Sequence, residues 1–205
     1  MWAAGIGAAL ALVASWKVAR PGFISLGTAV AATIGFLAAL VGAGWWAAIA
    51  AFISLFAIYL KISRWAAMPL AGAALLWLDA AHPEFSWLLV ISGAIALGGI
   101  TAEMLLGHWY LVDPKLPRRS LKVLAAIGAV GIAVDTVMVQ VYAVDTSVIS
   151  PAVLIGLGAT TVVLMVGVWF SLRVPSYTGV MAATGLSYLA TLTALGAVVI
   201  GRAVI

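Results

Sequence analysis

The chain has 205 residues, of which 66% are hydrophobic and 8% charged, and its mean hydropathy is +1.25. A soluble domain is about 45–50% apolar and about 25% charged, so this composition excludes an ordinary soluble protein. Cysteine is absent, which excludes disulfides, thiolate metal sites and iron–sulfur clusters. The net charge of +4 comes from residues in short segments between apolar runs, where it indicates membrane orientation rather than nucleic acid binding.

Eight apolar runs follow one another along the chain, separated by short breaks that are rich in proline, glycine or charge. A membrane-spanning helix needs about 17–25 mostly apolar residues. The predicted spans are residues 1–18, 23–41, 44–60, 65–81, 85–110, 120–144, 147–172 and 177–200. The third and fourth spans are short, so six helices plus a re-entrant hairpin is the alternative count. The sequence predicts an all-α, polytopic protein of the cell membrane, with residues 1–205 forming one integral membrane domain.

The basic residues predict an orientation for these spans. Nine of the ten lie in or beside the odd-numbered connections, and Arg202 is the exception. The nine are Lys17, Arg20, Lys61, Arg64, Lys115, Arg118, Arg119, Lys122 and Arg173. The even-numbered connections carry Asp79, His82, Glu84 and Asp145 and no Lys or Arg. Because basic residues favour the cytoplasmic side, the odd connections should be cytoplasmic and both termini extracytoplasmic.

A faint internal repeat relates the first span to the fifth. Trp16 and Pro21 have the same separation as Trp109 and Pro114. Each pair is followed by a small-residue segment that contains Ala-Ala-x-Ile-Gly or Ala-Ala-Ile-Gly. Two four-helix repeats of the same orientation, residues 1–84 and 85–205, would explain the pattern.

Two carboxyl groups are predicted at membrane depth, where a charge costs about 2.5–3.5 kcal/mol on insertion scales and so suggests function. Glu103 lies in the cytoplasmic half of the fifth span, and Asp135 lies slightly beyond the middle of the sixth. Their depths differ by roughly 15 Å, which predicts successive stations of a proton path rather than one close pair. Tyr110 and Tyr142 share helix faces with them and join the predicted path. The alternative is that buried carboxyls only bond neighbouring helices together.

Further polar side chains lie in the sixth and eighth spans. Gln140 is in the sixth, and a stripe with helical spacing runs along the eighth. The stripe consists of Thr184, Ser187, Tyr188 and Thr191. These residues are predicted to line a polar pathway, and helix–helix hydrogen bonding is the alternative.

The end of the fifth span combines the side chains that a quinone head-group site uses. His108, Trp109, Tyr110 and Asp113 could donate a hydrogen bond, stack a ring and exchange a proton. The same residues also fit an interfacial aromatic belt before a basic loop, which could dock a soluble partner or anionic lipid. Haem is disfavoured because the two histidines, His82 and His108, bracket the fifth span about 39 Å apart. Haem at His108 would need a methionine or another subunit, and the sequence predicts no metal site.

The leading functional hypothesis from the sequence is a membrane subunit of a respiratory or other electron-transfer complex. It would contribute a quinone-facing site and a proton path. Its expected partners are the lipid bilayer and membrane or peripheral subunits docking on the basic cytoplasmic loops, with no nucleic acid. Two alternatives stay open. One is a proton-coupled transporter of a small solute, and the other is a structural or assembly subunit.

Overall fold

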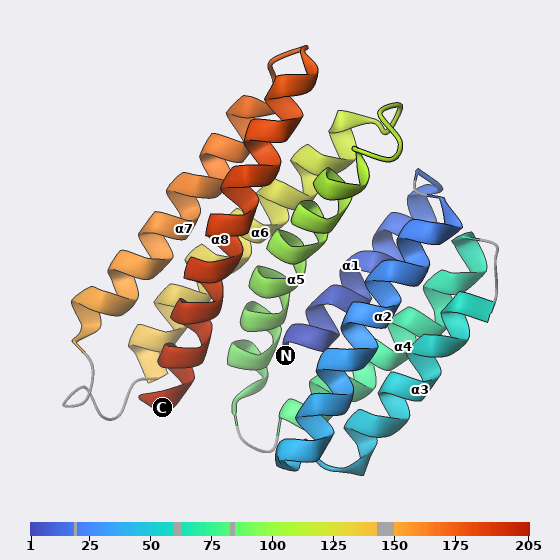
Figure 1. Ribbon diagram of the computed structural model, residues 1–205. Helices are drawn as coiled ribbons and strands as arrows, with labels where there is room; N and C mark the ends of the chain where they lie inside the picture. The colour runs from blue at the N-terminus through green and yellow to red at the C-terminus, as the bar shows by residue number, and fades with distance from the viewer. Residues whose placement is uncertain (19, 60–62, 83–84, 143–149) are drawn as a thin grey trace.

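The computed structural model describes residues 1–18, 20–59, 63–82, 85–142 and 150–205. Within these residues the chain forms eight α-helices, one π-helical turn and no strand. The elements are α1 (Trp2–Trp16), α2 (Pro21–Ala38), η1 (Ala39–Ala43), α3 (Trp45–Tyr59), α4 (Ser63–Ala81), α5 (Trp87–Trp109), α6 (Arg118–Tyr142), α7 (Pro151–Ser171) and α8 (Tyr177–Ala203). Figure 1 shows the helices side by side with alternating direction, and both termini at the same end.

Five of these helices are long and apolar enough to cross a membrane. They are α2 continued through η1, α5, α6, α7 and α8. The apolar parts of α1, α3 and α4 are shorter, at 10–17 residues. A 15-residue helix is about 22 Å long, whereas a hydrocarbon core is about 30 Å thick. The all-helical architecture is therefore that of a helical membrane protein, and the eight crossings and the extracytoplasmic termini stay predictions.

The outside of the bundle is apolar. Val41 is 86% exposed, Phe52 68% and Leu192 67%, and they lie on three different helical segments. Soluble monomers rarely expose contiguous apolar surface on this scale, because each such side chain orders water unfavourably. Lipid is the solvent that this surface matches.

The helices pack as two rings of four. In the first ring, α1 packs on α2, α2 on α3, α3 on α4, and α4 returns to α1. In the second ring, α5, α6, α7 and α8 pack in the same cyclic order. The rings meet mainly where α1 packs on α5 (Figure 1). This arrangement divides the chain where the predicted halves divide, although the duplication itself stays a prediction.

Helix α5 lies at the centre of the molecule, because it packs on α1, α6 and α8. Within its most apolar stretch 72% of the residues are buried, against 39% or less in the other four long helices. Glycines allow this crowding. A Cβ on Gly99 would lie 2.7 Å from the backbone nitrogen of Gly128 in α6, and one on Gly131 would lie 2.6 Å from that of Ala96. Such close backbone approach is how helices gain dispersion contact in lipid.

Helix boundaries agree with the predicted ones to within two residues, with α2 counted through η1, except at two helix ends. The predicted Gly42–Gly44 break is confirmed, since Gly42 has φ 109° and Gly44 φ 80°, conformations that L side chains rarely adopt. The seventh span was predicted to start at residue 147, but α7 begins at Pro151 after Ser150, whose hydroxyl accepts from the Ala152 N–H. The eighth was predicted to end at residue 200, but α8 continues to Ala203 and so includes Arg202.

The two ends of the bundle differ in charge. We call the end with the α1–α2, α5–α6 and α7–α8 connections the basic end. It carries Lys17, Arg20, Lys115, Arg118, Arg119, Lys122 and Arg173. The opposite end, here the terminal end, carries Met1 and Ile205 (Figure 1). Lys61, Glu84 and Asp145, which also entered the orientation prediction, lie outside the described residues.

Candidate functional site

Glu103 lies inside the contact between α5 and α8. Its side chain is fully buried, and its Oε2 accepts a hydrogen bond from the Ser187 hydroxyl of α8. Ser187 Oγ also lies 2.8 Å from the carbonyl oxygen of Ala183. The other carboxyl oxygen, Oε1, has no hydrogen-bond partner among the described residues. Leaving a buried polar atom unpaired costs about 1–3 kcal/mol, which marks this position as one that stability alone does not favour.

The predicted polar stripe of α8 faces this carboxyl. Thr191 Oγ1 approaches Met104 Sδ at 3.5 Å, next to Glu103 on α5. A Cβ on Gly107 would lie 2.7 Å from Thr184 Oγ1 and 3.8 Å from Glu103 Oε1. The missing side chain at Gly107 therefore lets Thr184 pack closely against α5. The structure thus pairs Glu103 with Ser187 and places Thr184 and Thr191 against Gly107 and Met104 of α5, as expected for α8 residues that share a face.

His108 and Tyr188 form a pair on the basic-end side of the same interface. Tyr188 Oη and His108 Nδ1 are 3.4 Å apart, and both side chains are exposed. His108 is one turn and a half along α5 from Glu103, toward the basic end. We call Glu103, His108, Thr184, Ser187, Tyr188 and Thr191 the α5–α8 polar interface.

The other residues predicted for quinone binding point to separate partners. Tyr110 is buried and its ring lies 6.2 Å from that of Tyr177. Trp109 packs edge-on against Phe23 of α2, with 6.1 Å between ring centroids.

Asp113 is likewise engaged elsewhere, because its Oδ2 is 2.8 Å from Arg20 Nε in an ion pair at the surface. The four side chains of the predicted quinone set thus have four different neighbours. Residues adjacent in sequence at a helix end point around the axis, so their order alone could not make them converge.

Asp135 lies in a second polar cluster, at the terminal end. Its Oδ1 is 2.6 Å from Arg202 Nη2 and accepts from the Ser92 hydroxyl at 2.6 Å. Arg202 Nη1 reaches Oδ2 at 3.3 Å, and Nη2 donates to the carbonyl of Leu89 at 2.6 Å. Both side chains are almost completely buried. The cluster joins α5, α6 and α8, and it neutralises the carboxyl that the sequence assigned to a proton path.

The remaining predicted residues, Tyr142 and Gln140, lie near the end of α6. Tyr142 packs against a small apolar cluster that contains Leu89, Val139 and Val204. Gln140 is half-buried, and its Nε2 has no partner among the described residues. Neither side chain approaches Glu103 or its hydroxyls through any described hydrogen bond.

Sequence reasoning missed Arg202 and Ser92 as the partners of Asp135. The signal was present, because a carboxyl buried in lipid needs a cation or hydrogen-bond donors at its own depth. Arg202 was the one basic residue that broke the charge alternation. Extending the last helix by less than one turn would have brought it to the depth of Asp135. Its pairing also explains the exception, since a neutralised and buried arginine contributes little to orientation.

No group of three or more metal-ligating side chains gathers in the described parts of the chain. The α5–α8 polar interface gathers one carboxyl, one imidazole and four hydroxyls from two packed helices. No family model matches the chain, and comparison with curated proteins and with solved structures gives no significant match.

Proposed function

We propose that this protein carries protons through the membrane, with Glu103 as the residue that binds and releases the proton. The observation that carries the proposal is a fully buried carboxyl with one oxygen on Ser187 and the other unpaired. A structural carboxyl would be expected to have both oxygens bonded, as Asp135 has.

Ser187 allows the carboxyl to exist in both protonation states. Its hydroxyl has one hydrogen and two neighbouring acceptors, Glu103 Oε2 and the Ala183 carbonyl. When Glu103 is ionised, the Ser187 hydrogen points to the carboxylate. When Glu103 is protonated, the acid can donate to Ser187 Oγ, and the Ser187 hydrogen turns to Ala183. One hydroxyl rotation therefore keeps the hydrogen bond between Glu103 and Ser187 in either state.

The His108–Tyr188 pair is the group through which Glu103 would exchange protons with the basic end, which the charge distribution predicts to be cytoplasmic. An imidazole and a phenol at 3.4 Å can relay a proton between water and the interior. Thr184 extends the polar surface between them and Glu103.

The test is proton flux into vesicles that contain the purified chain and an internal pH-sensitive dye, driven by a potassium diffusion potential. Glu103→Gln is expected to lower the flux at least about tenfold, because the amide cannot carry a proton. Asp79→Asn makes the same chemical change at an exposed carboxyl of α4 and should leave the flux unchanged. An inactive wild-type chain, or unchanged flux in Glu103→Gln, would contradict the proposal.

A second candidate is the quinone-facing subunit of an electron-transfer complex. The exposed His108–Tyr188 pair favours it, because two ring donors beside a buried carboxyl could bind a quinone carbonyl and supply its proton. The binding residues would then be His108 and Tyr188 rather than the set at the end of α5. Tyr188→Phe should weaken binding of a short-chain quinone analogue to the purified protein, with Tyr59→Phe as the control at an exposed tyrosine of α3.

A further inference from the structure

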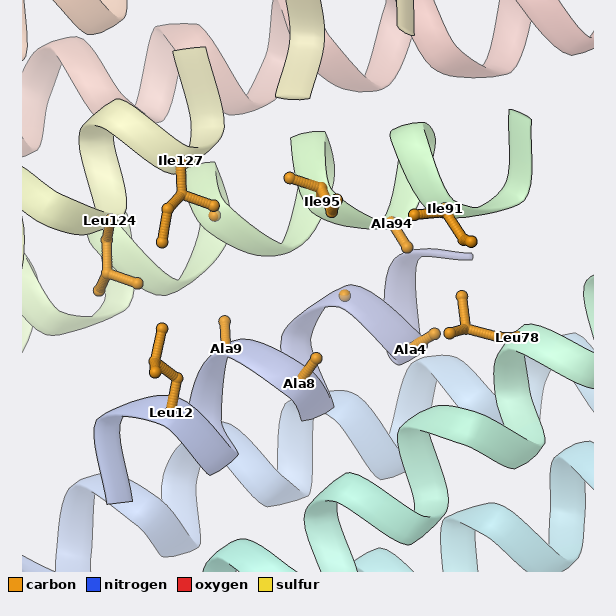
Figure 2. Close-up of a pocket in the computed structure, with 12 residues that line it drawn as sticks. Ala4, Ala8, Ala9, Leu12, Leu78, Ile91, Ala94, Ile95, Leu124 and Ile127 are labelled. Carbon is orange, nitrogen blue, oxygen red and sulfur yellow. The ribbon is translucent and has the colours of Figure 1, made fainter. Parts of the chain in front are cut away.

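Two cavities follow each other along α1 and α6. The first has a volume of about 190 Å³ and is walled by side chains of α1, α4, α5 and α6. Figure 2 shows Ala9 and Leu12 of α1 facing Leu124 and Ile127 of α6 across it, with α5 behind. All of its lining residues are apolar, so it suits a hydrocarbon chain.

The second cavity lies at the basic end and has a volume of about 470 Å³. Its wall is formed by Trp16, Val18, Pro117, Arg119, Ser120 and Val123. Trp16 is one turn beyond Leu12 on α1, and Ser120 is one turn before Leu124 on α6. Residues four apart share a helix face, so the two cavities lie one after the other along the same faces of α1 and α6. We call the two cavities together the α1–α6 groove.

The basic end of the groove holds unused groups that bind anions. Arg119 is exposed and has no hydrogen bond or ion pair with another described residue. Its neighbour Arg118 is occupied, since it donates to the carbonyls of Val174, Pro175 and Ser176. Ser120 is 7% exposed and lines the cavity, and its hydroxyl has no partner among the described residues. Both residues are in the first turn of α6, where the helix dipole favours negative charge.

We propose that the α1–α6 groove binds one anionic phospholipid. The phosphate would lie at Arg119 and Ser120, beside the Trp16 ring, and one acyl chain would extend past Leu12 and Leu124 into the apolar cavity. The apolar continuation favours an amphiphile over a free anion. The unpaired cation, with no carboxylate in the wall, favours an anionic head group over a zwitterionic one. The proposal does not depend on proton transport by Glu103.

The experiment measures lipid retention by the full-length protein, using native mass spectrometry in detergent with equal amounts of dioleoyl phosphatidylglycerol and dioleoyl phosphatidylcholine. The wild-type protein should retain one phosphatidylglycerol in preference to phosphatidylcholine. Arg119→Gln should lower this affinity about fivefold, and Arg119→Lys should largely restore it. Lys115→Gln removes the same charge from the basic end outside either cavity wall, and it should leave retention unchanged. Equal losses in both Gln variants, or no preference between the lipids, would overturn the proposal.

A second pair of variants tests the acyl-chain part. Ala9→Leu fills the apolar cavity and should reduce retention of the dioleoyl lipid, whereas Ala126→Leu adds the same atoms at an exposed position of α6 and should not. Glycerol phosphate should fail to displace the bound lipid at equal concentration. Displacement by glycerol phosphate, or equal retention in both Leu variants, would mean that the site binds a free anion and would overturn the proposal. Thermal unfolding of each variant without added lipid identifies any loss of retention that comes from misfolding.

Discussion

Gly5 of α1 lies directly against Gly98 of α5, so that a Cβ added to either glycine would clash with the backbone of the other helix. Gly5 would meet the Ala94 carbonyl, and Gly98 would meet the backbone of Gly5 itself. This approach is the main contact between the two rings of four helices. At these two glycines the joint is therefore backbone against backbone, with no side chain that could move aside. Elsewhere in the same contact, the Trp2 indole N–H of α1 donates to the Thr101 hydroxyl of α5 at 3.0 Å.

Gly98→Ala should loosen this joint. The added methyl group has no space, and overpacking of this kind costs about 1–3 kcal/mol. The free energy of unfolding, measured in mixed micelles with increasing dodecyl sulfate, is the readout.

Gly156→Ala is the matched control, because a Cβ at Gly156 of α7 meets nothing within 4 Å. That change should be neutral or stabilising by up to about 1 kcal/mol, since alanine is the better helix former. Equal effects of the two substitutions would contradict the close approach of α1 and α5.

The buried ion pair between Asp135 and Arg202 should be sensitive to loss of either partner alone. Arg202→Gln leaves a carboxylate without its cation, and breaking a buried pair in this way costs about 3–5 kcal/mol. The double substitution Asp135→Leu and Arg202→Met should cost less than the sum of the single ones, because neither charge remains. The coupling is measured from the free energies of unfolding, in the same micelles, of the wild type, Asp135→Leu, Arg202→Met and the double variant.

The surface pair between Arg20 and Asp113 provides the comparison. Its arginine side chain is 70% exposed, whereas that of Arg202 is 6% exposed. Arg20→Gln should therefore change the free energy of unfolding by only about 0–1 kcal/mol. If Arg20→Gln lowered the free energy of unfolding strongly and Arg202→Gln lowered it only slightly, the assignment of Asp135–Arg202 as the buried pair would be contradicted.

The absence of cysteine allows a direct test of orientation and span count. Single substitutions Lys17→Cys and Lys115→Cys should react with a membrane-impermeant maleimide only after the cells are permeabilised, because the basic end is predicted to be cytoplasmic. His82→Cys and Ile205→Cys should react in intact cells. Labelling of all four before permeabilisation would contradict the orientation.

Tyr59→Cys, at the exposed end of α3, distinguishes the two span counts. If α3 crosses the membrane, this position should behave like Lys17→Cys. If α3 and α4 form a re-entrant hairpin, it should stay unlabelled under both conditions.

Arg118 should hold the connection between α7 and α8. Its guanidinium donates to three successive carbonyls, those of Val174, Pro175 and Ser176. Arg118→Gln should raise amide hydrogen exchange around Tyr177 and Thr178, because the fixed fork of donors that holds the turn is lost. Arg119→Gln, at the neighbouring unpaired arginine, should leave exchange there unchanged. The reverse result would mean that the connection is held by other contacts.

Much of the helical layout could be predicted from the sequence. Apolar runs broken by Pro21, by Gly42 and Gly44 and by Pro175 gave helix positions close to those observed, because such breaks change the backbone locally. The α8 stripe could also be predicted, since residues three and four apart share a face whatever the tertiary packing. Its meeting with Glu103 required only that α5 and α8 be neighbours.

Side-chain partners between distant helices could not be predicted in the same way. Trp109 and Tyr110 are adjacent in sequence, yet one packs on Phe23 and the other on Tyr177, because successive helical residues diverge by about 100°. Asp135 and Arg202 meet only because two helices happen to reach the same depth. The order of helices around each ring determines these contacts, and periodicity within a helix carries no information about it.

The ion pair also constrains the order in which the molecule can be assembled during synthesis. Arg202 follows Asp135 by 67 residues, and at about 5–20 residues per second the ribosome needs roughly 3–13 s to supply it. Throughout that interval α6 carries a carboxyl whose cation does not yet exist. The second ring therefore reaches its final packing only after α8 has emerged, and not helix by helix. A chain interrupted before Arg202 would leave the Asp135 carboxyl unpaired inside the membrane.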